Sequence, residues 1–96
     1  MNETVIHDPE QQKFFLMRDG QEALLAYALH EGSVIEFTET HVPEELRGGS
    51  IASRLAATGL QYAVDHGYRI VPTCSYIRNY INKYRNYRQY FKDDTA

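Results

Sequence analysis

The chain has 96 residues and a formal net charge of -3; 43% of its residues are hydrophobic and 12% are aromatic. This length suits one compact domain and is too short for two, so we expect a single domain over residues 1–96. The single cysteine, Cys74, excludes an intrachain disulfide, and no Cys/His spacing indicates a bound metal. Without a secretory leader pattern or a run of about 20 apolar residues for a membrane helix, the sequence predicts a cytoplasmic protein.

Charge is distributed unevenly along the chain. Residues 1–46 hold ten acidic and two basic residues, whereas residues 47–92 hold eight basic residues and one acidic residue, Asp65. One interpretation is that the two halves attract each other across the fold. The other is that charged ligands bind, an anion near the C-terminal half and a cation near the N-terminal half.

The first half of the sequence predicts an antiparallel meander. Apolar runs at 3–7 and 13–18 flank a turn that contains proline. Asp-Gly at 19–20 is a strong hairpin signal and predicts that the next run, 21–30, is also a strand. The Ala and Leu residues of that run favour a helix by propensity, so tertiary context has to override them. Alternating side chains predict a fourth strand at 34–42.

In the second half the hydrophobic period becomes that of a helix. Apolar residues recur at helical spacing over 51–66, and Gly67 follows as the expected left-handed cap. A buried strand predicted at 68–74 is then reached through a right-handed crossover. Two further helical stretches, at 75–84 and 85–91, complete an α+β order.

The start of the predicted helix carries positive charge instead of the usual negative charge. A helix N-terminus is already partly positive, so sequences usually place Asp or Glu in the first turn, and none is present here. Arg47 and Arg54 flank this terminus, and the glycine pair after Arg47 lets the backbone approach a ligand. An external anion would balance the charge. Alternatively, Ser50 simply caps the helix and the glycines form a turn.

The order of elements and the segment LRGGSIAS resemble the GCN5-related N-acetyltransferase superfamily, whose Arg/Gln-x-x-Gly-x-Gly/Ala loop wraps the pyrophosphate of acetyl-coenzyme A. More narrowly, HVPEELRGGSIASRL followed by GYRIVPTCSYIRNYI is similar to the minimal acetyltransferase-like members of that superfamily. The resemblance implies a mostly antiparallel sheet of about five strands, with a crossover helix and C-terminal helices. It also implies acetyl transfer from acetyl-coenzyme A to an unidentified amine. The coenzyme-binding residues implied are Val42, Arg47, Gly48, Gly49, Ser50, Ile51 and Ala52, with Tyr76 and Tyr80 as wall residues.

The sequence departs from the family pattern at two places. Ser50 stands at the central glycine of the loop and adds a Cβ where the backbone approaches phosphate. Glu39 stands where the small relatives commonly have a histidine, and His41 follows two residues later. Alternation places Glu39 and His41 on the same face of the strand, so either is a candidate general base acting through water. The alternative is that both are polar residues at a strand end.

Cys74 is the third catalytic candidate. It closes the fifth predicted strand and opens the next helix, where a thiol can have a lowered pKa and become nucleophilic. Its match to the cysteine of the small family implies a position near the thioester, as an acyl acceptor or as an acid. The alternative is that Cys74 is a buried, small apolar side chain.

Two other functions remain open. The chain could be a coenzyme-binding module without catalysis, or it could hold single-stranded nucleic acid on a tyrosine stripe interleaved with basic residues. The acidic first half would repel a phosphate backbone, which disfavours the second. The stripe consists of Tyr76, Tyr80, Tyr84, Tyr87 and Tyr90. Because only a turn fits between the first two strands, the acceptor site is open or completed by a partner, including another copy in a homo-oligomer. A cationic acceptor, such as a polyamine, another small amine or a lysine side chain, suits the acidic half.

Overall fold

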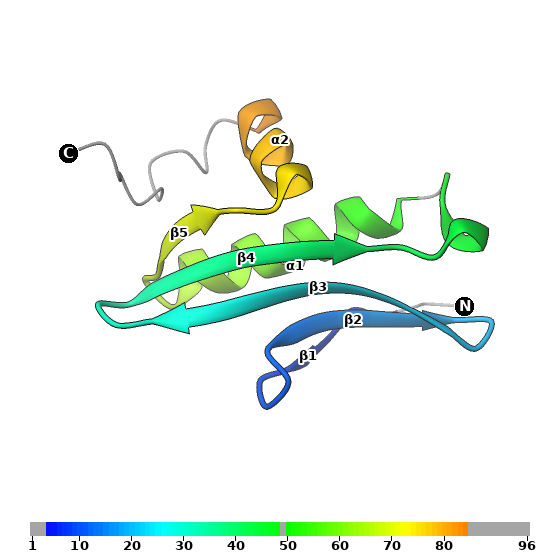
Figure 1. Cartoon of the computed structure of the whole chain (residues 1–96), viewed down its shortest axis with the longest axis horizontal. Coiled ribbons are helices and arrows are strands. Elements are labelled where there is room, and N and C mark those ends of the chain that lie inside the picture. The colour runs from blue at the N-terminus through cyan, green and yellow to red at the C-terminus, as the bar shows by residue number, and fades with distance from the viewer. Residues whose placement is uncertain (1–3, 49, 85–96) are drawn as a thin grey trace.

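The computed structural model describes residues 4–48 and 50–84. In chain order the elements are β1 (Ile6–Asp8), β2 (Lys13–Arg18), β3 (Gln21–His30), β4 (Val34–His41), the short helix η1 (Glu44–Leu46), α1 (Ile51–Asp65), β5 (Arg69–Pro72) and α2 (Ser75–Lys83) (Figure 1). Gly49 and the helical stretch predicted at 85–91 lie outside the described residues.

The five strands form one sheet in the order β1-β2-β3-β4-β5. Neighbouring strands are antiparallel except β4 and β5, which are parallel and joined through α1. Gly67 follows α1 with a φ of 72°, as predicted for the cap. The predicted α+β fold, with its mostly antiparallel sheet and crossover helix, is confirmed.

Three strand predictions have the wrong bounds, and the one at 34–42 differs by a single residue, because β4 ends at His41. The apolar run at 3–7 places the first strand too early, because pairing with β2 starts beside the turn, at Asp8↔Lys13, and extends back only to Ile6↔Phe15. The strand predicted at 68–74 is confined to Arg69–Pro72. Its parallel partner residues on β4 end at Phe37, and Cys74 already serves as the N-cap of α2.

One face of the sheet packs against α1, which runs alongside β4 (Figure 1). The helix approaches closely at Gly59, where a Cβ would lie 2.7 Å from Leu25 Cδ2 and 3.2 Å from Phe37 Cε1. The other face is less covered: Ile6 and Met17 are each 49% exposed. The hydrophobic core therefore lies mainly between the helices and one face of the sheet.

A bulge in β4 changes which side chains face the helix. The register skips a residue, because successive pairs are Leu25↔Thr40, Ala26↔Glu39 and Tyr27↔Phe37. Thr38 is the extra residue on β4. Residues opposite each other in antiparallel strands share a face, so both Phe37 and Thr40 face α1, although unbroken alternation would place them on opposite faces.

Within residues 4–48 and 50–84, no helix is long and apolar enough to cross a membrane.

Candidate functional site

The loop between β4 and α1 keeps positive charge exposed at the start of the helix. Leu46 of η1 is buried and anchors the loop, whereas Arg47 and Gly48 are exposed. The Arg47 Nε donates a hydrogen bond of 2.8 Å to the Val42 carbonyl oxygen, which joins the residues on either side of η1. Gly48 has a φ of 93°, a conformation that other residues rarely adopt. Gly49 lies outside the described residues.

Ser50 occupies the N-cap position of α1 without capping it through its side chain. The first helical hydrogen bond runs from the Arg54 N–H to the Ser50 carbonyl oxygen, at 2.9 Å. The amides of the preceding residues, Ile51 to Ser53, therefore have no carbonyl partner within the helix. The first turn contains no acidic residue. The φ of Ser50 is -102°, so serine replaces the family's glycine here without backbone strain.

Not every predicted residue can present its side chain to a ligand. Ile51 is 1% exposed and packs in the core, so only its backbone is available. Ala52 is half-buried. Arg54 lines a separate cleft beside Thr4 and Val5.

A cleft of about 220 Å³ lies between the start of α1 and one side of α2. Its lining residues are Ser53, Tyr76, Asn79, Tyr80, Lys83 and Tyr84. Tyr76 and Tyr80, the predicted wall residues, are neighbours, with ring centroids 6.3 Å apart. Burial, followed by the nearby Tyr84, raises the pKa of Tyr76, so its hydroxyl remains protonated at neutral pH.

The structure adds Asn79 and Lys83 to this cleft. Helical spacing from Tyr76 and Tyr80 could have identified them, because residues three and four apart share a helix face. The three described tyrosines of the stripe all line the cleft, whereas Tyr87 and Tyr90 lie outside the described residues.

Cys74 lies where β5 separates from β4. The last β4–β5 pair is Phe37↔Pro72, and the Cys74 N–H then donates to the Phe37 carbonyl oxygen at 2.8 Å. The Cys74 side chain is buried, with 8% exposure for the residue, and its Sγ is 3.2 Å from Thr40 Oγ1. Sequence reasoning missed Thr40, because only the bulge directs it toward Cys74.

Glu39 and His41 are both exposed and lie on the sheet face away from α1. They pair with Ala26 and Leu24, which alternate with the buried Leu25. The prediction that they share a face is confirmed. The structure does not place them on the face of Thr40, the partner of Cys74, so the predicted catalytic candidates are divided between two faces.

Glu36 adds a carboxylate to the same outer face. It pairs with Ala28 and accepts hydrogen bonds from Thr73 Oγ1 at 2.5 Å and, when His30 presents an N–H, from its Nε2 at 2.8 Å. The bond from Thr73, followed by that from His30, lowers the pKa of Glu36. Glu36 is therefore ionised at neutral pH, so this face carries negative charge beside Glu39.

Comparison with known proteins decides the family. A family model described as GCN5-related N-acetyl-transferase matches residues 13–90. The chain belongs to this N-acetyltransferase family. Protein NATD1 of Mus musculus and Protein NATD1 of Homo sapiens are each 30% identical to it over 81 residues. These matches cover 82% of the chain and 74% and 72%, respectively, of the two relatives.

The N-acetyltransferase match includes the loop, the cleft beside α2 and Cys74. It begins at Lys13 and thus excludes β1. The elements that carry the candidate site are those shared with the family, whereas the N-terminal edge of the sheet lies outside the matched segment.

Proposed function

We propose that this N-acetyltransferase-family chain binds acetyl-coenzyme A beside the start of α1 and transfers the acetyl group to a cationic amine. The supporting observation is the acid-free N-terminus of α1, uncapped by Ser50, next to a cleft lined by tyrosines. Free amides at a helix N-terminus, together with an arginine, match the charge of a diphosphate. The tyrosine rings offer apolar surface to the rest of the coenzyme. The donor set therefore fits the coenzyme.

In this proposal, residues on the two faces of β4 have different catalytic roles. Acetyl-coenzyme A supplies an activated acetyl thioester. Where β5 separates from β4, Cys74 acts in one of two ways. It takes the acetyl group, with loss of its own proton and release of the coenzyme thiol, and then passes the acetyl group to the amine, or it donates a proton to the thiolate that departs when the amine attacks the thioester directly. Thr40 orients the Cys74 thiol through their 3.2 Å contact. On the outer face, Glu39 or His41 removes the proton from the amine through water.

The outer face also supports a cationic acceptor. The ionised Glu36 and the carboxylate side chain of Glu39 lie on it, so an ammonium group is attracted there before it loses its proton. The proposed class of acceptor is a cationic amine, which includes both small amines and lysine side chains.

Calorimetry with acetyl-coenzyme A tests the coenzyme site. Arg47→Glu should abolish binding, whereas Arg69→Glu, a matched charge reversal at an exposed position on β5, should change the Kd little. Equal binding by the Arg47 variant would place the coenzyme elsewhere. No binding by the unmodified chain at millimolar ligand would reject the proposal.

Turnover on a panel of amines then tests the chemistry. Cys74→Ala should retain coenzyme binding and lose acetyl transfer. The burial of Cys74 favours one competing candidate, a coenzyme-binding module without catalysis. Coenzyme binding by the unmodified chain without transfer to any amine would favour that candidate.

A further inference from the structure

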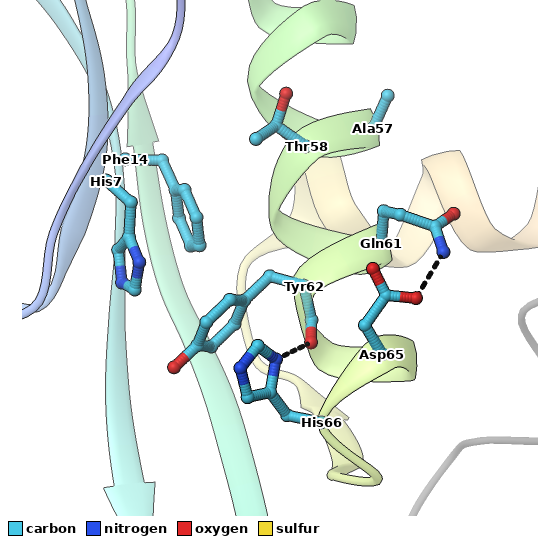
Figure 2. Close-up of a pocket in the computed structure, with 8 residues that line it drawn as sticks. All are labelled: His7, Phe14, Ala57, Thr58, Gln61, Tyr62, Asp65 and His66. Carbon is cyan, nitrogen blue, oxygen red and sulfur yellow. Dashed lines mark hydrogen bonds between the residues drawn. The ribbon is translucent and has the colours of Figure 1, made fainter.

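A third cleft lies between the N-terminal edge of the sheet and the C-terminal half of α1 (Figure 2). Its volume is about 610 Å³, and it shares no lining residue with the cleft beside α2. One of its walls includes His7 of β1, which precedes the segment matched by the family model. The proposed coenzyme chemistry uses none of its residues.

Aromatic and imidazole rings form much of the cleft wall. Figure 2 shows His7 and Phe14 on the strand side and Tyr62 and His66 on the helix side. His7 stacks on Phe14 with ring centroids 4.4 Å apart, and the Tyr62 ring meets His7 edge-on at 4.5 Å. The His66 ring is 4.1 Å from that of Tyr62. The faces of aromatic rings carry partial negative charge, so this wall suits an apolar ligand that bears a cation.

The polar residues of the cleft add full negative charge. Asp65 is the one carboxylate among its described lining residues, and these include neither lysine nor arginine. Gln61 Nε2 donates a hydrogen bond of 2.8 Å to Asp65 Oδ1, as Figure 2 shows. This bond holds the carboxylate in place and uses only one of its two oxygens.

His7 does not offset the charge of Asp65 at neutral pH. Burial, followed by the nearby His66, lowers the pKa of His7, and the opposing effect of Asp8 is smaller. Near pH 7 the His7 ring is therefore mostly neutral. Its Nε2 shares a hydrogen bond of 2.5 Å with the Tyr27 hydroxyl, whose pKa burial raises to about 12. This contact fixes the His7 ring in the cleft wall.

We propose that this cleft binds an organic ammonium ion with a short apolar body, its charge held by the Tyr62 ring and the Asp65 carboxylate. An anion would be repelled by Asp65, and a neutral ligand would gain nothing from it. The ligand is a free amine or an alkylated lysine side chain, because both present the same group. The site is separate from the proposed acceptor face, which lies on the opposite side of the sheet.

Titration of the full chain with choline, followed by NMR, tests this site. We expect the amide signals of Gln61, Tyr62 and His66 to shift in a saturable manner. The neutral isostere of choline, with a tert-butyl group in place of trimethylammonium, should bind at least about threefold more weakly, as expected for loss of a cation–π contact. Equal affinities, or no saturable shift with choline, would overturn the proposal.

Matched variants locate the charge effect. Asp65→Asn keeps an oxygen for Gln61 and should weaken choline binding by at least about threefold. Asp19→Asn removes the same charge from an exposed turn and should not. Tyr62→Phe should retain binding because it retains the ring. If both aspartate variants weakened choline binding equally, the general negative charge of the protein would explain the binding, and the proposed site would be rejected.

A peptide containing trimethyl-lysine distinguishes the two sources of ligand. Tighter binding than choline, with shifts at the same three amides, supports a protein side chain as the ligand, whereas weaker binding supports a free amine. Acetyl-coenzyme A affinity, measured on the same Asp65→Asn sample, should be unchanged. Failure of the choline experiment would thus be separable from failure of the proposed transferase function.

Discussion

Cys74 Sγ lies 3.2 Å from Thr40 Oγ1, which connects the residue that caps α2 to the part of β4 beyond its bulge. The contact depends on the bulge at Thr38, because a regular ladder that included Thr38 would turn Thr40 away from the helix side. Glu39 and His41, on either side of Thr40, consequently face outward. One strand thus contributes to both faces of the candidate site.

Removal of the Thr40 hydroxyl should affect transfer more than binding. Thr40→Val keeps the shape of the side chain and removes the partner of Cys74. We expect kcat to fall by about two- to tenfold, the usual range for one hydrogen bond, with coenzyme Kd unchanged. Thr38→Val, in the exposed bulge, is the control, and an equal loss there would argue against a positioning role for Thr40.

Substitution of Ser50 should move stability and coenzyme affinity in opposite directions. Ser50→Asp should stabilise α1 by about 0.5–1 kcal/mol, because a carboxylate favours a helix N-terminus. The same charge should weaken acetyl-coenzyme A binding by roughly tenfold, or about 1.4 kcal/mol. Chemical denaturation and calorimetry measure the two effects. Ser50→Asn supplies a neutral cap, and equal coenzyme affinity of the Asp and Asn variants would show that no anion binds here.

Gly59→Ala should destabilise the fold although alanine favours a helix. The gain in helix propensity is about 1 kcal/mol, whereas overpacking a core costs about 1–3 kcal/mol. The new Cβ would lie 2.7 Å from Leu25 Cδ2, and Leu25 is fully buried. We expect a net loss of about 1 kcal/mol in urea unfolding. In a Leu25→Ala background, Gly59→Ala should leave the stability unchanged or increase it. An equal loss of stability in that background would show that the new Cβ clashes with a residue other than Leu25.

His7 should make the fold less stable as the pH falls below neutrality. Its pKa is lower in the folded chain than the ordinary value of 6.5, mainly through burial, so the unfolded chain binds the proton more readily. Stability is therefore lost as the pH falls from 6.5 toward the folded-state pKa. Thermal unfolding between pH 5 and 7.5 should show a smaller pH effect in His7→Gln. An identical pH profile would attribute the effect to other groups.

Local sequence patterns were sufficient to predict most of the fold. The Ala- and Leu-rich segment that forms β3 is a strand because the Asp19-Gly20 turn holds it against β2, and strands pair with it on both sides. Both turn residues have positive φ, 53° and 76°, as a tight hairpin of this type requires. The helix start at Ile51 also agrees with its sequence pattern.

The divided site could not be predicted from alternation alone. The segment Thr38–His41 is polar throughout, so an extra residue leaves no break in its hydrophobic pattern. The cleft between β1 and α1 was missed for a different reason. His7 and Tyr62 come from distant parts of the chain, and only the packing of α1 against the sheet edge brings their rings together. The loop residues, in contrast, form one continuous motif and are visible in the sequence.

The single extra residue in β4 also determines which genetic changes this strand tolerates. Substitution at Thr38 leaves the register intact, and deletion would only remove the bulge, because Glu39 would still lie opposite Ala26 and Thr40 opposite Leu25. Glu39 and His41 would then still point outward and Thr40 toward Cys74. The end of this strand should therefore tolerate the loss of this one codon as well as point mutation, with its inner and outer side chains unchanged.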